Sequence, residues 1–307
     1  MNITIRQLQY VVVASRKRSI QGAASELNIS TSSILMAIDK FEQEFGIQLF
    51  VRQRAKGLVT TAAGESAIAR TIRMLDEAEA FVRDLSGGGQ VLSGELRVGS
   101  FTSISPNIAP QVIRELRAAF PELIVHLSEG DIISIQRSLR DGAVDILLTY
   151  DAGLWDEFDF EFLAKAPPHV VLATSDPLAE KERISLEDLS DRTLLLLNLP
   201  QSRNYVQSIF EHAGVRPGPI QRLESFEMVR ASAAAGLGAA ILNIRPCTDT
   251  TYCGLPVVCR PLVEAEPCPN IVLATRRGSR VSRRAQAFAS ICRQFFESDN
   301  ARHLFVK

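Results

Sequence analysis

The sequence has no apolar run of the roughly 18 residues that a membrane-spanning helix requires. Its first residues, MNITIRQLQYVVV, also lack the charged start, long apolar stretch and small-residue cleavage site of a secretory signal. The apolar and charged fractions are those of ordinary globular proteins, and 307 residues suffice for more than one domain. We therefore expect a cytoplasmic protein with no membrane partner.

Cysteine is scarce and lies late in the chain, at Cys247, Cys253, Cys259, Cys268 and Cys292. No two of these residues have the C-x-x-C spacing of a metal site, so no metal is predicted. Because disulfides are uncommon in a reducing compartment, we expect free thiols, with a redox switch as the alternative.

Catalytic motifs are absent as well. The histidines are scattered, and neither an H-E-x-x-H pattern nor a G-x-S-x-G nucleophile turn occurs. Gly236-Leu237-Gly238 resembles the start of a dinucleotide fingerprint, but Ile241 replaces its last glycine and the segment follows a predicted helix instead of a strand. The sequence thus predicts no enzyme activity and no cofactor.

Charge is unevenly distributed along the chain. The net charge is -1, yet residues 1–60 hold eight Lys or Arg against four acidic residues, which gives +4 and leaves -5 for the remainder. A local positive field on an acidic protein attracts phosphates without making the whole molecule adhere to them. The first 60 residues are therefore the candidate nucleic-acid-binding part.

Residues 1–60 also have the pattern of a helix-turn-helix. Thr4, Ser19 and Ser30 are each suited to cap a helix, and Asn28 and Ile29 form a tight turn between the second helix and the third. In the third helix Ile34, Ile38, Phe41 and Phe45 recur at the spacing of one buried face. The outward residues, predicted to contact DNA together with the cap Ser30, are Thr31, Ser32, Ser33, Met36, Ala37 and Lys40.

A basic wing is predicted after Gly46, which ends the third helix. Gln48 to Val51 and Leu58 to Thr60 read as two short strands. Their connection carries Arg52, Arg54 and Lys56, side chains suited to contacts with DNA phosphates.

A long helix is expected from Thr61, its cap, to about Leu85. The apolar residues Ile68, Ile72, Leu75 and Val82 recur at nearly the spacing of a coiled-coil seam, with charged residues on both flanks. This pattern predicts a dimer seam. The alternative is that the helix packs only on its own domain.

Beyond Ser86-Gly87-Gly88-Gly89, strands and helices alternate, which is typical of parallel sheets covered by crossover helices. Expected strands are 95–101, 123–128, 145–150, 169–174, 193–197, 221–224, 239–243 and 270–275. Expected helices are 106–120, 131–141, 202–213, 226–235 and 281–297. The chain is thus of α+β class overall, with a mostly helical start and an α/β remainder.

The segments AASELNIS, FEQEFGIQLFVR and TTAAGE, in this order around the wing, resemble the amino-terminal domain of LysR-type transcriptional regulators. The resemblance extends over the chain and implies four parts: a winged helix-turn-helix in 1–60, a dimerising linker helix in 61–86, a hinge in 87–91 and an effector-binding domain in 92–307. That domain is expected to have two lobes similar to type 2 periplasmic binding proteins, 92–163 with 268–307 and 164–267.

The same resemblance implies three kinds of partner: double-stranded DNA, a small-molecule effector and further copies of the chain. The copies would form a homodimer or a dimer of dimers. RNA polymerase is a further candidate. The sequence departs from the family at Thr31 to Met36, where amide and basic side chains that read bases are usual. The operator sequence therefore cannot be carried over from the family.

Three predicted strand ends carry hydroxyl or amide groups, namely Ser100 to Ser103, Thr149 to Tyr150, and Asn198 to Ser202. Ligands of open parallel sheets gather at such ends, beside helix amino termini. The alternative is that Ser103 and Ser202 only cap the helices that follow. With Glu129, Gly130 and Phe226 added from the resemblance, the predicted effector-binding residues are Ser100, Phe101, Thr102, Ser103, Glu129, Gly130, Thr149, Asn198, Gln201, Ser202 and Phe226.

Neutral donors and helix dipoles suit a carboxylate, so the predicted effector is a small organic anion that alters operator binding without being transformed. The alternative function is a cytoplasmic solute-binding protein with the two-lobed fold and no regulatory role. A gel shift on upstream DNA separates the two.

Overall fold

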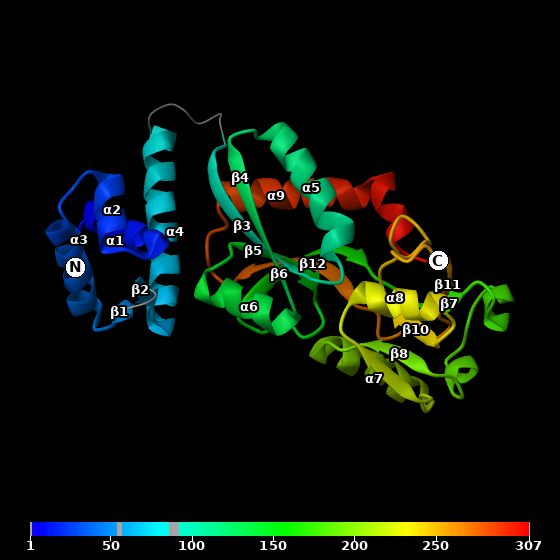
Figure 1. Cartoon of the computed structure of the whole chain (residues 1–307). Helices are drawn as coiled ribbons and strands as arrows, with labels where there is room; N and C mark the ends of the chain where they lie inside the picture. Colours follow the sequence, from blue (N-terminus) through cyan, green and yellow to red (C-terminus); the bar gives the residue numbers. More distant parts are fainter. Residues whose placement is uncertain (1, 54–56, 86–91, 307) are drawn as a thin grey trace.

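The computed structural model describes residues 2–53, 57–85 and 92–306. A small helical domain at the amino terminus is followed by one long upright helix and then by an elongated part that contains two sheets (Figure 1). In the described part of the chain no helix is long and apolar enough to cross a membrane. The same residues contain no group of three or more side chains that could hold a metal ion.

Three short helices form the first domain: α1 (Ile5–Lys17), α2 (Ile20–Leu27) and α3 (Thr31–Phe45). The predicted caps are confirmed, since Thr4, Ser19 and Ser30 each accept a hydrogen bond from a backbone N–H in the first turn of the helix that follows. Asn28 adopts the left-handed conformation at the end of α2, which makes the tight turn between α2 and α3 possible.

The buried face of α3 differs from the predicted one at two residues. Ala37, predicted to face DNA, is fully buried together with Ile34, Ile38 and Phe41. It lies three residues after Ile34 and four before Phe41, so it shares their face, and its small side chain lets the helices approach closely. Phe45, predicted to be buried, is exposed, with its ring centroid 4.6 Å from that of Phe41.

The wing consists of β1 (Phe50–Gln53) and β2 (Gly57–Thr60), paired antiparallel with Phe50 opposite Thr60. Glu42 of α3 holds its base by accepting hydrogen bonds from the backbone N–H groups of Leu49, at 2.6 Å, and Phe50, at 3.3 Å. The position of the wing relative to α3 is thereby fixed by a side chain of α3 itself.

Helix α4 (Ala62–Leu85) begins after Thr61, whose hydroxyl accepts from the Gly64 N–H. Ile68 and Leu75 are buried in the core of their own domain, and Ile72 packs against the same core, so the dimer seam stays a prediction for these residues. Val82, near the end of the helix, is 61% exposed. The apolar stripe thus serves the domain core first, and the packing on α1 accounts for the spacing that resembled a coiled coil.

Lobe 1 is built on a five-stranded sheet of order β4-β3-β5-β12-β6. Its strands are β3 (Gly94–Phe101), β4 (Leu123–Gly130), β5 (Ile146–Tyr150), β6 (Phe158–Lys165) and β12 (Asn270–Arg276). Helices α5 (Ser105–Ala119) and α9 (Arg283–Glu297) pack together on one face, and α6 (Ile132–Asp141) lies on the other (Figure 1).

Lobe 2 has a second five-stranded sheet of order β11-β7-β10-β8-β9. Its strands are β7 (His169–Ala173), β8 (Leu194–Leu197), β9 (Ile220–Leu223), β10 (Ala239–Leu242) and β11 (Val257–Pro261). Alternate residues of β8 face opposite sides, so Leu194 and Leu196 pack under α7 (Pro200–Ala213) and Leu195 and Leu197 under α8 (Phe226–Ala234).

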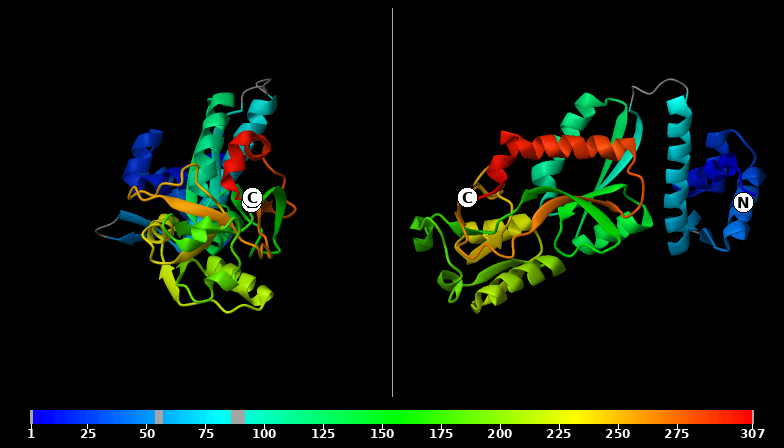
Figure 2. Two further views of the ribbon diagram at one scale, coloured as in Figure 1. Left: turned by 90° about the vertical axis from the view of Figure 1, so that its right-hand side faces the viewer. Right: turned by 180° about the vertical axis from the view of Figure 1, so that it is seen from behind.

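The prediction of parallel strands holds only for the pairs that β3 and β8 form. Strands β12 and β7 are antiparallel to their neighbours, and β6 and β11 were not predicted at all. The chain passes from β6 to β7 and later from β11 back to β12, so two segments run side by side between the lobes (Figure 2).

Candidate functional site

The start of α3 presents a group of hydroxyl side chains. Thr31 and Ser32 are exposed and Ser33 is half-buried. The Oγ atom of Ser30 lies 2.7 Å from the Oγ of Ser32 and 2.9 Å from that of Ser33. This network holds the hydroxyls at the end of the helix that a helix-turn-helix inserts into the major groove. Each hydroxyl can donate to or accept from a base edge.

Two further predicted DNA contacts lie along α3, where Met36 is exposed and Lys40 is half-buried. Arg52 belongs to β1. Arg54 and Lys56 lie outside the described residues, so their contacts with phosphate stay predictions.

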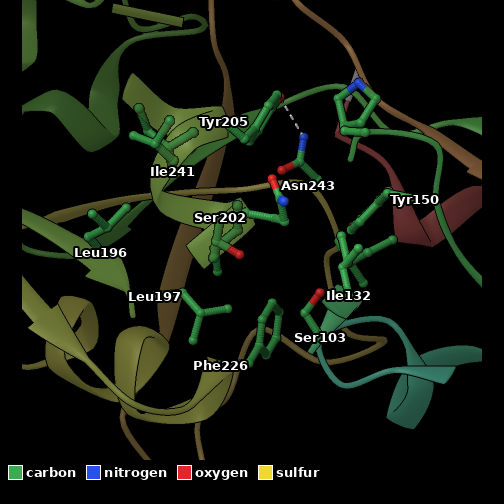
Figure 3. A pocket seen from close by; sticks show the side chains of 16 residues that line it. Ser103, Ile132, Tyr150, Leu196, Leu197, Ser202, Tyr205, Phe226, Ile241 and Asn243 are labelled. Atoms are coloured by element: carbon green, nitrogen blue, oxygen red, sulfur yellow. Dashed lines mark hydrogen bonds between the residues drawn. The ribbon is translucent and has the colours of Figure 1, made fainter. Parts of the chain in front are cut away.

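A cavity lies between the two lobes, lined by sixteen residues (Figure 3). Lobe 1 contributes Ser103, Ile132 and Tyr150, and lobe 2 contributes Ser202, Tyr205 and Phe226 from α7 and α8. The Ser103 and Ser202 side chains both point into the space between the lobes (Figure 3). The free volume is about 50 Å³.

Of the predicted effector-binding residues, Ser103, Gln201, Ser202 and Phe226 line this cavity. The others do not: Ser100, Phe101, Thr102, Glu129, Gly130, Thr149 and Asn198. Ser100 and Thr149 lie next to last in β3 and β5, at the strand ends that were expected, but both side chains are fully buried. Asn198 is engaged elsewhere, donating to Glu224 at 2.7 Å and accepting from Arg203 at 3.1 Å.

Ile132, Tyr150, Tyr205 and Asn243 also line the cavity and were not among the predicted contacts, although Tyr150 belonged to a predicted strand end. A signal existed for two of them. Tyr205 follows Ser202 by three residues and so shares its helical face. Tyr150 follows Thr149 on β5, and because successive strand residues face opposite sides, only one of the two could reach the cavity. For Asn243 no local signal existed.

The polar groups of the cavity are neutral, since none of the sixteen lining residues is charged. Burial raises the pKa of Tyr150 and of Tyr205, so both phenols keep their protons and can donate. Asn243 donates from Nδ2 to the Tyr205 hydroxyl, at 2.9 Å, and to the carbonyl of Ala166, at 2.8 Å. These bonds connect the cavity wall to the segment that crosses between the lobes.

The amino terminus of α7 opens onto this cavity without a side-chain cap, because its N-cap residue is Leu199. Ser202 lies inside the helix, and the residue that precedes α5 is likewise apolar, Ile104, so no side-chain hydrogen bond caps that helix. The alternative that Ser103 and Ser202 serve as caps is therefore wrong. Pro200, the first residue of α7, carries no N–H, so the amides that stay available to an anion are those of Gln201 and Ser202.

Comparison with known families agrees with this architecture. The description "Bacterial regulatory helix-turn-helix protein, lysR family" matches residues 5–65, and "LysR substrate binding domain" matches residues 89–297. The chain belongs to the LysR family of transcriptional regulators. It is a DNA-binding regulator with a carboxy-terminal domain that binds a small-molecule effector, and the alternative of a solute-binding protein without a regulatory role is not favoured.

Individual relatives extend over nearly the whole chain. The hydrogen peroxide-inducible genes activator of Dickeya chrysanthemi is 27% identical over 297 residues, which is 96% of each chain. The uncharacterized regulator YfeR of Shigella flexneri is 25% identical over 95% of this chain and 94% of its own. The crystal structure of HinK, a LysR family regulator from Pseudomonas aeruginosa, superposes with a TM-score of 0.63 at 28% identity, covering 96% of this chain and 99% of that one.

Proposed function

We propose that this LysR-family regulator senses a small carboxylate in the cavity between its lobes. The observation that carries the proposal is the amino terminus of α7, which lacks a side-chain cap and lies in a cavity wall with Ser103 and Ser202. Neutral donors and a helix dipole stabilise a carboxylate without the full charge of an arginine.

The free volume limits the size of the ligand. A cavity needs at least about 10–15 Å³ of free volume to hold a single water molecule. The volume of about 50 Å³ thus admits a ligand of few non-hydrogen atoms in this arrangement of the lobes. Apolar walls formed by Ile132, Leu197 and Phe226 suit a short hydrocarbon part beside the carboxylate.

Several relatives are named as hydrogen peroxide-inducible activators, but this cavity is not suited to sensing peroxide through a thiol. No cysteine is among the sixteen lining residues. Cys268, which lines a neighbouring pocket, has a raised pKa because burial and the nearby Glu266 disfavour its thiolate. A thiol in that state is a poor nucleophile towards peroxide.

The protein acts, in this proposal, on double-stranded DNA in the cytoplasm. Thr31, Ser32 and Ser33 contact base edges, and Arg52, Arg54 and Lys56 contact phosphates. Two copies of the chain place two recognition helices on two half-sites, and RNA polymerase is the partner through which the bound regulator acts on transcription. The ligand changes operator affinity by about 1 to 3 kcal/mol through different affinities for two lobe arrangements.

The test uses the full chain, a panel of short metabolite carboxylates and calorimetry. Ser202→Ala should weaken the binding of any hit about tenfold or more, because a hydrogen bond to a charged group is lost. Thr102→Val is the matched control, since Thr102 lies outside the cavity lining and should bind the hit with wild-type affinity. Hits that bind Ser202→Ala as tightly as wild type would place the effector elsewhere. A gel shift on DNA fragments selected with the purified protein then measures whether the hit alters DNA binding.

A further inference from the structure

A larger cavity lies within lobe 2, between α7 and the edge strand β9, with a free volume of about 410 Å³. This volume is within the range of about 300 to 1,000 Å³ that small-molecule sites occupy. It opens on the opposite side of α7 from the cavity between the lobes, because Arg203, Gln207 and Phe210 face it while Gln201, Ser202 and Tyr205 face the other. We call it the α7–β9 groove.

The floor of the α7–β9 groove is apolar, and the edge strand β9 is left partly uncovered. Strands β8 and β9 are parallel and pair Leu194 with Ile220 and Leu196 with Arg222, so these four side chains share the face that α7 covers. Leu194 and Leu196 are buried, whereas Ile220 is 48% exposed. The buried Phe210 and the half-buried Val215 complete this floor, in which Ile220 is the most exposed apolar side chain.

The rim of the groove is basic. Arg203, Arg216 and Arg222 surround it, against the single acid Glu211. Glu211 accepts a hydrogen bond from Gln207 at 2.6 Å, and Arg203 donates to Asn198. Arg216 and Arg222 form neither an ion pair nor a hydrogen bond through their side chains with any residue of the described chain. Two guanidinium groups beside an apolar floor complement an anion with an apolar body.

We propose that the α7–β9 groove is a second ligand site, which takes a carboxylate with an aliphatic or aromatic body larger than the cavity between the lobes admits. Arg216 and Arg222 bind its carboxylate, and Ile220, Phe210 and Val215 contact its apolar part. This site does not depend on the identity of the effector between the lobes.

Helix α7 couples the two sites. Leu196 and Val206 line both the groove and the cavity between the lobes, and Arg203 of the groove bonds to Asn198, in the loop that leads to the uncapped start of α7. A ligand in the groove that displaces α7 therefore changes the cavity on its other side. Such coupling makes DNA binding respond to two ligands.

The probe is octanoate, with octanamide as its uncharged counterpart, in calorimetry on the full chain. Octanoate should bind wild type, and octanamide should bind roughly tenfold more weakly or worse. The double variant Arg216→Gln/Arg222→Gln should lower octanoate affinity at least roughly tenfold. Ile220→Glu, a change at a half-exposed position that the fold tolerates, should repel the carboxylate to a similar extent. The matched control is Arg117→Gln, which removes an exposed arginine of α5 in the other lobe.

Absence of octanoate binding to wild type, or wild-type affinity in both the double variant and Ile220→Glu, would overturn the second site. A loss of octanoate binding in Ser202→Ala but not in the double variant would also overturn it, because the probe would then occupy the cavity between the lobes. For the coupling, saturating octanoate should change the affinity for a selected DNA fragment about fivefold or more, and not in the double variant. An unchanged DNA affinity would refute the coupling.

Discussion

Shortening Leu75 to alanine should destabilise the DNA-binding domain while the oligomer keeps its mass. Leu75 of α4 is 8% exposed and belongs to the same buried cluster as Leu8, Val11 and Phe41. A seam residue would instead be buried only by a partner chain. Leu75→Ala therefore distinguishes packing within the chain from packing between chains.

The magnitude follows from the side-chain atoms removed. Leucine to alanine deletes three carbon groups, each worth about 0.8 kcal/mol when buried, which gives about 2.4 kcal/mol before any cavity forms. The cavity left behind raises the loss to about 3 to 4 kcal/mol. This is a large share of the roughly 5 to 15 kcal/mol that stabilises a domain, so the variant domain should unfold at a clearly lower urea concentration.

The assay is urea unfolding of the full chain followed by circular dichroism, with mass measured by light scattering. Met74→Ala is the matched control, because Met74 neighbours Leu75 on α4 and is 44% exposed. It should cost under about 1 kcal/mol. A Leu75→Ala protein that unfolds at the wild-type urea concentration but has half the wild-type mass would refute the packing described here and restore Leu75 to the seam.

Two other predictions concern assembly and pH. Val82→Asp introduces a charge on the exposed end of α4. It should lower the mass of the oligomer, measured by light scattering, and abolish operator binding. An unchanged mass would show that this end of the helix lies outside the dimer contact. Burial, aided by Arg245, lowers the pKa of His169 to about 3. Between that value and its unfolded pKa of about 6.5 the unfolded chain binds the extra proton. The free energy of unfolding therefore decreases as the pH is lowered, by about 1.6 kcal/mol from pH 6.5 to 5. His169→Gln should reduce this loss in urea unfolding at the two pH values, and an equal loss in both proteins would contradict the assignment.

The helix starts of the DNA-binding domain could be read directly from the sequence. Thr4, Ser19, Ser30 and Thr61 all cap as expected, because a cap bonds to an amide only three residues away. The burial of Ala37 could not be read in this way. A small apolar side chain fits either face of a helix, and the packing of α1 and α2 on α3 decided which face it took.

The strands could likewise be predicted only where the sequence of the strand itself has a distinctive pattern. Strands β8 and β10 are short apolar runs buried on both faces, and such runs are recognisable in isolation. Strand β6 alternates exposed phenylalanines with acidic residues at the edge of its sheet, and β11 ends in Arg260 and Pro261, so neither has the pattern of a buried strand. Their pairing with β12 and β7 depends on where those distant strands lie.

The cavity between the lobes was only half determined by the sequence. Ser103, Gln201 and Ser202 could be proposed because they stand at strand ends and helix starts, which are local features, whereas Phe226 came from the family resemblance. The bond from Asn243 to Tyr205 joins residues 38 positions apart, and its second bond, to Ala166, spans 77. Such partners are brought together only when two chain crossings set one lobe against the other, so tertiary structure alone decided which polar groups face the ligand.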